Sequence, residues 1–177
     1  LYGSFLATGK GHGTDRALIA GLLGMKPADE RIPESFELAK QQNLEFSFGR
    51  VDFAEAHPNT VKLNLTGKSG RRLEVTAESI GGGRVRIRQI DGLEANFCGD
   101  YATLIVHNLD QPGHVAEVTS MLAHKSINIA TMQLYRDGRG GHAVMVVECD
   151  REVPEESRKW LAHLEGIIKV TYLSMEE

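Results

Sequence analysis

The residues best suited to chemistry lie in one glycine-rich stretch, Gly9–Asp15, with His12 in its middle. An apolar run at 1–7 precedes it and is predicted to form a buried strand; another at 17–23 follows and is predicted to form a buried helix. Three glycines within five residues require a tight turn or a close backbone approach. Thr14 or the residue after it is suited to cap the helix. A histidine held on such a turn can serve as a general base or bind an anion.

Other interpretations of this turn are a plain structural connection with a solvated histidine, a phosphate-binding loop or a dinucleotide-binding loop. The phosphate-binding loop is excluded because Lys10 lies too far before the helix and lacks the Gly-Lys-Ser/Thr order. The dinucleotide-binding loop is excluded because the glycines at 9, 11 and 13 have the wrong spacing. General-base chemistry and a plain turn both remain open at this point.

Composition and charge exclude several classes of protein. The chain has 177 residues, 41% of them hydrophobic, and a formal net charge of −4, which argues against a nucleic-acid-binding surface. It has no apolar run long enough to span a membrane. Cys98 and Cys149 are too few for a disulfide framework or for a four-iron cluster, so we expect a chain of the reducing cytosol. The seven histidines show no metal-binding spacing, so no metal site is expected.

Residues 1–98 are predicted to form an α+β domain with a mainly antiparallel sheet, because alternating strands follow two helices. The elements expected after the first helix are a helix over 34–42, and strands over 44–48, 61–65, 73–77, 85–88 and 93–97. Gly81–Gly83 is either a bulge or flexible turn, or a set of bare amides that receive a carboxylate or a neighbouring chain.

Residues 101–177 are predicted to form a second domain with the order βαββαβ, a ferredoxin-like fold. The expected elements are strands over 101–107, 127–134, 143–148 and 167–172, and helices over 115–124 and 155–164. In the second of these helices, Trp160, Leu161 and Leu164 are expected to face inward.

This C-terminal part resembles the ACT domain, a regulatory module that binds amino acids. The resemblance rests on Asn108–Gly113 and Ser126–Ile129. It implies an amino-acid effector held between two such domains by four positions of this sequence: Asn108, Asp110, Gly113 and Asn128. A helix N-terminus beginning at a glycine suits a carboxylate, and carboxylate and amide oxygens suit an ammonium. An ACT domain that only packs, without a ligand, is the alternative.

The whole chain resembles the beta chains of iron–sulfur-dependent L-serine dehydratases. The motifs that carry this resemblance, in order, are Leu1–Phe5, Gly9–Asp15, Asp29–Pro33, His57–Thr60 and Ser79–Gly83. Such chains normally begin with roughly fifty more residues, including a Gly-Pro-Ser-Ser-Ser-His-Thr segment of the catalytic site. We therefore expect the N-terminal domain to be truncated, and a chain without that segment to be inactive.

The resemblance implies conversion of L-serine to pyruvate and ammonia, with an alpha chain as partner. A 4Fe–4S cluster on that alpha chain, not on this one, would act as the Lewis acid. His12 is expected to be the general base, and Thr14 to hydrogen-bond the substrate or the imidazole. We also expect a homodimer formed through the ACT domains. The alternative is a non-catalytic, amino-acid-binding regulatory fragment like those of phosphoglycerate dehydrogenases.

Overall fold

Contacts within the chain gather in two units, Leu1–Lys62 and Leu63–Glu177. The structure, a computed structural model, describes residues 1–174. The expected domain boundary near residue 98 therefore lies inside the second unit, and β1 (Thr60–Thr66) runs across the boundary between the units. No helix of residues 1–174 has the length and apolar content needed to cross a lipid bilayer.

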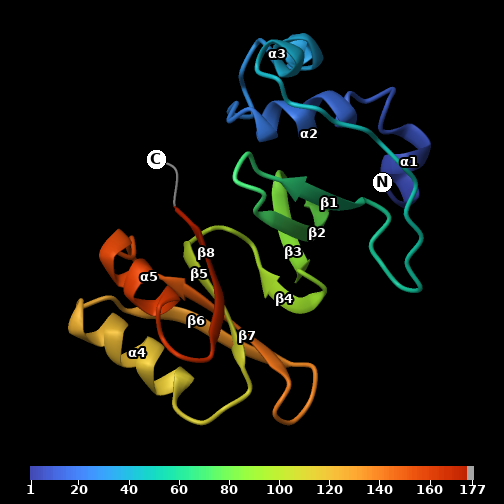
Figure 1. The fold of residues 1–177 in the computed structure, drawn as a ribbon. Coiled ribbons are helices and arrows are strands. Elements are labelled where there is room, and N and C mark those ends of the chain that lie inside the picture. The colour runs from blue at the N-terminus through green and yellow to red at the C-terminus, as the bar shows by residue number, and fades with distance from the viewer. Residues whose placement is uncertain (175–177) are drawn as a thin grey trace. The chain divides into compact units, whose positions relative to one another are not determined.

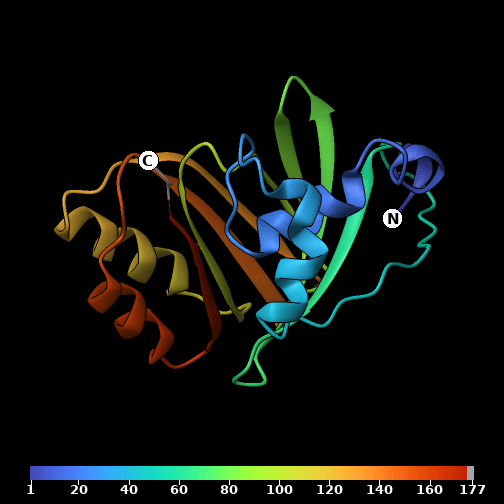
Figure 2. The ribbon, with the colours of Figure 1, turned by 90° about the horizontal axis from the view of Figure 1, so that it is seen from above.

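The first unit is built from short helices (Figure 1). They are α1 (Gly3–Thr8), α2 (Thr14–Leu22), the 3-10 helix η1 (Ile32–Glu34) and α3 (Ser35–Gln41). The α2 and α3 helices lie side by side (Figure 2), and the buried Ser35 hydroxyl donates to the Arg16 carbonyl at 2.9 Å. The Arg16 guanidinium lies 5.0 Å from the centre of the Phe36 ring. The predicted helices at 17–23 and 34–42 are thus confirmed, and α3 ends where Asn43 takes a φ of +56°.

The strand predicted over residues 1–7 is wrong, because this run forms α1, none of whose residues is buried. The backbone before and within α1 is bound to a distant loop: Tyr2 N–H donates to the Thr60 carbonyl, and Ser4 N–H to the Pro58 carbonyl. These two isolated backbone hydrogen bonds fix the start of a helix. A strand would need a continuous series of such hydrogen bonds to a neighbouring strand. The apolar run at residues 1–7 is therefore not part of a sheet.

The strand predicted over residues 44–48 is also wrong, since this segment forms neither strand nor helix. Its alternating aromatic residues pack instead against α3. The Phe46 ring lies 5.0 Å from the Phe36 ring and 5.9 Å from the Phe48 ring, centre to centre. The alternation thus reflects an aromatic cluster, which gives the same period-two pattern as a half-buried strand.

Four strands form the first sheet, in the order β1-β2-β3-β4. After β1 they are β2 (Arg72–Gly81), β3 (Arg84–Ile90) and β4 (Leu93–Phe97). The hairpin predicted about Asp91-Gly92 is confirmed, with Ile90 opposite Leu93. Gly81–Gly83 forms the β2–β3 turn beside a register shift, and all three glycines have positive φ. A bulged turn is therefore the right description of this motif's backbone.

The second sheet has the order β6-β7-β5-β8 and is antiparallel throughout. Its strands are β5 (Ala102–Leu109), β6 (Ile129–Arg136), β7 (His142–Cys149) and β8 (Ile167–Leu173), and its helices are α4 (His114–His124) and α5 (Glu155–Ala162). The predicted βαββαβ order, and with it the ferredoxin-like α+β fold, is confirmed. Both helices cover one face of this sheet (Figure 2), over a core that includes Leu104, Val118 and Leu161.

One helix face was predicted only in part. Leu161 is fully buried and Leu164 packs on the core as expected, but Trp160 is 48% exposed. Leu161 shares its buried face with Ser157, one turn earlier, and Trp160 is turned from that line by about 100° because α-helices have 3.6 residues per turn.

The other face of the second sheet packs on the first sheet through Ile105, Val144 and Val146. At the edge of this contact lies a small charged group. The carboxylate of Asp91, at the β3–β4 turn, pairs with the ammonium of Lys169 on β8 and lies 4.0 Å from Nε2 of His107 on β5. Burial lowers the pKa of His107, and the Asp91 carboxylate opposes that effect only in part. This histidine therefore favours its neutral form.

Candidate functional site

The His12 ring is held by a backbone carbonyl. Its Nδ1 lies 3.0 Å from the Thr8 carbonyl oxygen, which also accepts the His12 backbone N–H at 3.2 Å. Because a carbonyl can only accept, Nδ1 must carry the hydrogen. In the neutral ring the lone pair is then on Nε2, and the residue is exposed. The geometry thus presents one basic nitrogen in a fixed tautomer.

Glycine is required in this turn by contact as well as by conformation. A Cβ on Gly9 would lie 2.2 Å from the Phe5 carbonyl oxygen, so α1 and the turn approach too closely for any side chain. Gly13, at φ +71°, caps α2, and no side chain provides a capping bond there. The predicted cap at Thr14 or Asp15 is therefore wrong, since the Thr14 amide already donates to the Gly9 carbonyl at 2.8 Å.

The loop His57–Thr60 supports this turn through α1. A Cβ on Gly3 would lie 2.4 Å from the Pro58 carbonyl oxygen, so the first residue of α1 is seated directly on the loop. The loop is itself braced, because the Thr60 hydroxyl donates to the His57 carbonyl and the Asn59 amide donates to Nδ1 of His57. The motifs Leu1–Phe5 and His57–Thr60 thus pack together within the first unit, and the loop positions the start of α1.

Thr14 lies at the first position of α2, close to Gly9. Among residues 1–174, no hydrogen bond joins the Thr14 hydroxyl to the His12 ring. A role for Thr14 toward the substrate stays a prediction.

A second candidate site lies at the turn between β5 and α4, where Asn108, Asp110 and Gly113 come together. Asn108 is 3% exposed; its Nδ2 donates to the Leu109 carbonyl, and its buried Oδ1 has no partner among the described residues. Gly113, at φ +111°, precedes α4 and provides no side-chain cap. A buried acceptor therefore lies in the segment that leads to the N-terminus of α4.

Asp110 already has partners in this turn. Its carboxylate accepts from the Arg136 guanidinium at 3.3 Å and from the Gly140 amide at 3.1 Å. Arg136 ends β6, and Gly140 lies in the β6–β7 turn, so three segments meet at this carboxylate. Neither partner was predicted, because no local pattern links residues 26 and 30 positions apart. Any ammonium bound by Asp110 must share it with Arg136.

His114 is a further residue of this turn that the sequence did not reveal. It is 6% exposed, its Nδ1 donates to the Glu117 carboxylate at 3.0 Å, and its buried Nε2 has no partner among the described residues. Gly166 makes room for it, since a Cβ there would lie 2.6 Å from Nε2. The carbonyl of Gly166 also accepts the Leu109 amide, so this packing fixes the end of β5.

Asn128 lies at the opposite end of the sheet from the other three residues. It precedes Ile129, which pairs with Cys149 at the end of β7, whereas Asn108 pairs with Ala143 near the start of β7. Six strand residues separate the two levels, which is about 20 Å. Its Nδ2 donates to the Asp150 carboxylate at 2.7 Å, which leaves the amide oxygen as the outward acceptor. One chain therefore does not bring the four predicted residues together.

The two cysteines do not form a ligand set for an iron–sulfur cluster. Cys149 is buried in the core of the second sheet, and burial raises its pKa to about 11. Iron ligation needs accessible thiolates, which this thiol does not provide. Among residues 1–174, no group of three or more His, Cys, Asp or Glu side chains could hold a metal ion.

Comparisons with known proteins match two families to successive parts of the chain. The model of the serine dehydratase beta chain family matches residues 1–89, and the model of the ACT domain matches residues 102–159. The chain is 39% identical to the probable L-serine dehydratase beta chain of Bacillus subtilis, over 98% of this chain and 78% of that protein. This chain belongs to the family of L-serine dehydratase beta chains. It is 35% identical to the L-serine dehydratase beta chain of Peptoniphilus asaccharolyticus, over 99% of this chain and 79% of that protein.

More distant similarity extends to another class of enzyme. The chain is 27% identical to the D-3-phosphoglycerate dehydrogenase of Methanocaldococcus jannaschii, over 99% of this chain but only 33% of that protein. The dehydrogenase therefore contains a related segment as a minor part of a longer polypeptide.

Proposed function

We propose that this chain is the beta subunit of an L-serine ammonia-lyase, which converts L-serine to pyruvate and ammonia. The observation that carries the proposal is similarity to beta chains over nearly the whole sequence, in a fold that holds His12 on a glycine-rich turn. In this proposal the chain supplies a general base and amino-acid regulation to an alpha chain.

His12 takes the α-proton of serine. Its Nε2 accepts the proton, and the Thr8 carbonyl keeps its bond to Nδ1–H in the resulting imidazolium. The ring keeps its orientation during the transfer because the same carbonyl holds the backbone amide. We assign to Thr14, at the first turn of α2, a hydrogen bond to the substrate.

The alpha chain carries the 4Fe–4S cluster in this proposal. The described cysteines of the beta chain are unsuited to it, since Cys149 is a buried thiol, and no step assigned to this chain depends on the cluster. Free cysteines suit the cytoplasm, where we place the enzyme.

The ACT domain binds an amino acid between two copies of the chain. β6 is an edge strand. Antiparallel pairing of two β6 strands would bring the Asn128 end of one copy beside the Arg136 end of the other, where Asp110 lies. The effector carboxylate then meets the amides after Gly113, and its ammonium meets the oxygens of Asp110 and Asn128.

A non-catalytic regulatory fragment is the second candidate function, and the phosphoglycerate dehydrogenase relatives favour it. The two candidates differ at His12. A regulatory domain needs no base on that turn, whereas a lyase subunit loses its activity without it.

The test is His12→Asn in the complete beta chain assembled with its alpha chain. Loss of a general base is expected to lower pyruvate formation by about 10²–10⁴-fold, while co-elution with the alpha chain is unchanged. His163→Asn is the matched control, because its Nδ1 also bonds the carbonyl four residues earlier, Lys159, on an exposed helix end. If the His12 variant kept more than about a third of the activity, another group would have to be the base.

A further inference from the structure

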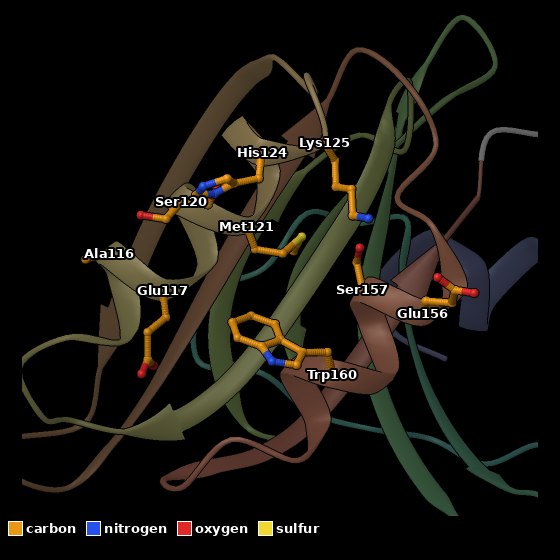
Figure 3. Close-up of a pocket in the computed structure, with 9 residues that line it drawn as sticks. All are labelled: Ala116, Glu117, Ser120, Met121, His124, Lys125, Glu156, Ser157 and Trp160. Carbon is orange, nitrogen blue, oxygen red and sulfur yellow. The ribbon is translucent and has the colours of Figure 1, made fainter.

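A groove of about 700 Å³ lies between α4 and α5, on the helix side of the second sheet (Figure 3). Its lining residues come from these two helices and from Lys125, directly after α4. This volume falls within the usual range of small-molecule sites, about 300–1,000 Å³. None of the residues proposed above to bind the effector lines it.

The middle of the groove is apolar and flat-sided. The Met121 side chain reaches from α4 toward α5, and the Trp160 indole lies opposite it (Figure 3). Met121 is 8% exposed and Trp160 is 48% exposed, so the indole presents a broad surface that no other part of the described chain covers. An aromatic face opposite a thioether favours a planar, apolar ring between them.

One end of the groove is polar, and two of its polar groups have no partner in the described part of the chain. Ser157 is 4% exposed, and its hydroxyl has no hydrogen-bond partner in the described part of the chain. Figure 3 shows this hydroxyl and the Lys125 ammonium at the same end of the groove. The Lys125 ammonium makes no ion pair or hydrogen bond within residues 1–174. A buried hydroxyl and a free cation at one place suit a carboxylate, which can accept from both.

Two glutamates lie on the rim of the groove. Glu117 accepts from the His114 ring at 3.0 Å, at the far end of the groove. The Glu156 carboxylate points away from Met121 and Trp160 in Figure 3. The polar end also lies at the first turn of α5, where Glu155 and Glu156 already supply the negative charge that a helix N-terminus favours, so a bound carboxylate depends on Lys125 and Ser157.

We propose that this groove binds a small aromatic monocarboxylate. The ring lies between Met121 and Trp160, and the carboxylate accepts from Lys125 and Ser157. The site is separate from the proposed effector site between chains and from His12, and it does not depend on the reaction proposed above.

The chain reports on this site directly, because Trp160 is its only tryptophan. Tryptophan fluorescence of the full chain is titrated with 3-phenylpropionate. A saturable change is expected. 3-Phenylpropanol, which lacks the carboxylate, is expected to bind at least about tenfold more weakly, since a hydrogen bond to a charged group contributes that much. Propionate, which lacks the ring, is also expected to bind at least about tenfold more weakly, because it loses the apolar contact with Met121 and Trp160.

Two variants test the polar end, and a third serves as control. Lys125→Met and Ser157→Ala are each expected to weaken 3-phenylpropionate binding by about tenfold. Lys159→Met removes an exposed lysine of α5 that pairs with Glu155. This variant is expected to bind 3-phenylpropionate with the affinity of the wild type. Circular dichroism checks that each variant is folded.

No saturable signal with 3-phenylpropionate would overturn the proposal, as would equal affinity for the acid and the alcohol, or unchanged binding in both the Lys125 and Ser157 variants. Binding of L-serine at the ACT turn has no bearing on these outcomes, so failure here and failure of the proposed function are distinguishable.

Discussion

Gly166→Ala tests how the end of β5 is held. Gly166 has a φ of +80°, and a Cβ there would lie 2.6 Å from Nε2 and 2.8 Å from Cε1 of His114. Its carbonyl accepts the Leu109 amide at 2.8 Å, directly before the turn that carries Asp110. The substitution therefore affects both a backbone conformation and a close contact with a buried ring.

The expected loss in the free energy of unfolding has two parts. A non-glycine residue with left-handed φ costs about 1–2 kcal/mol. Forcing a methyl group against a packed, 6% exposed ring adds about 1–3 kcal/mol, because His114 must move. Together the substitution is expected to lower the free energy of unfolding by about 2–5 kcal/mol. Gly99→Ala is the matched control, since Gly99 has a φ of +76° and no atom lies within 4 Å of its Cβ position; only the first part, about 1–2 kcal/mol, is expected there.

Urea unfolding followed by fluorescence of Trp160, the sole tryptophan, measures the second unit. The double variant Gly166→Ala/His114→Ala removes the clash but keeps the strained backbone. It is therefore expected to show a coupling energy of about 1–3 kcal/mol between the two sites. Equal losses of stability in Gly166→Ala and Gly99→Ala, or additive effects of the substitutions at 166 and 114, would show that the added methyl group does not clash with His114.

Three further predictions concern the second unit. Burial lowers the pKa of His107, so the unfolded chain binds a proton there more readily, and the wild type is expected to lose stability as the pH falls below about 6.5. In His107→Gln, the urea midpoint is expected to change less between about pH 7.5 and about pH 5.5. The same pH dependence in both chains would contradict this prediction. Asn128→Ala is expected to weaken L-serine binding, measured by calorimetry, by about tenfold, and equally tight binding would remove this residue from the effector site. Burial raises the pKa of Cys149 to about 11, so this thiol is expected to be unreactive in the folded chain. An aromatic disulfide reagent at about pH 8 is therefore expected to modify Cys98 alone in the folded chain and both thiols in urea. Rapid reaction of both thiols in the folded chain would contradict this prediction.

The C-terminal half could be predicted from sequence because its signals are local. Each strand of the second sheet is a β-branched or apolar run, and each helix has residues of one face at helical spacing, as with Val118 and Leu122. Short turns such as Asp137–Gly141 separate these runs. The central strands β5 and β7 are buried along nearly their whole length, so continuous apolar runs mark them, and the order βαββαβ follows from the chain alone.

The N-terminal unit could not be predicted in the same way. The run at 1–7 is apolar enough for a strand, but its amides bond to Pro58 and Thr60, and the result is α1. The alternation at 44–48 comes from rings that pack on Phe36. In both places, a contact with a residue distant in sequence outweighed local preference, which is weak in short segments.

The family, the fold of the ACT part and the place of His12 on a glycine-rich turn follow from residue types and short spacings, which the chain shows before it is folded. The folded chain adds which nitrogen of His12 carries the proton, that Arg136 shares Asp110, and that Asn128 lies at the other end of the sheet from Asn108. It also decided that Trp160 faces outward into a groove beside a buried, unpartnered Ser157. Strand register, the partners of Asp110 and the choice of buried face are set between segments far apart in the chain. The tautomer of His12 depends on the conformation of the turn that brings its ring to the Thr8 carbonyl, so residue types alone do not encode it.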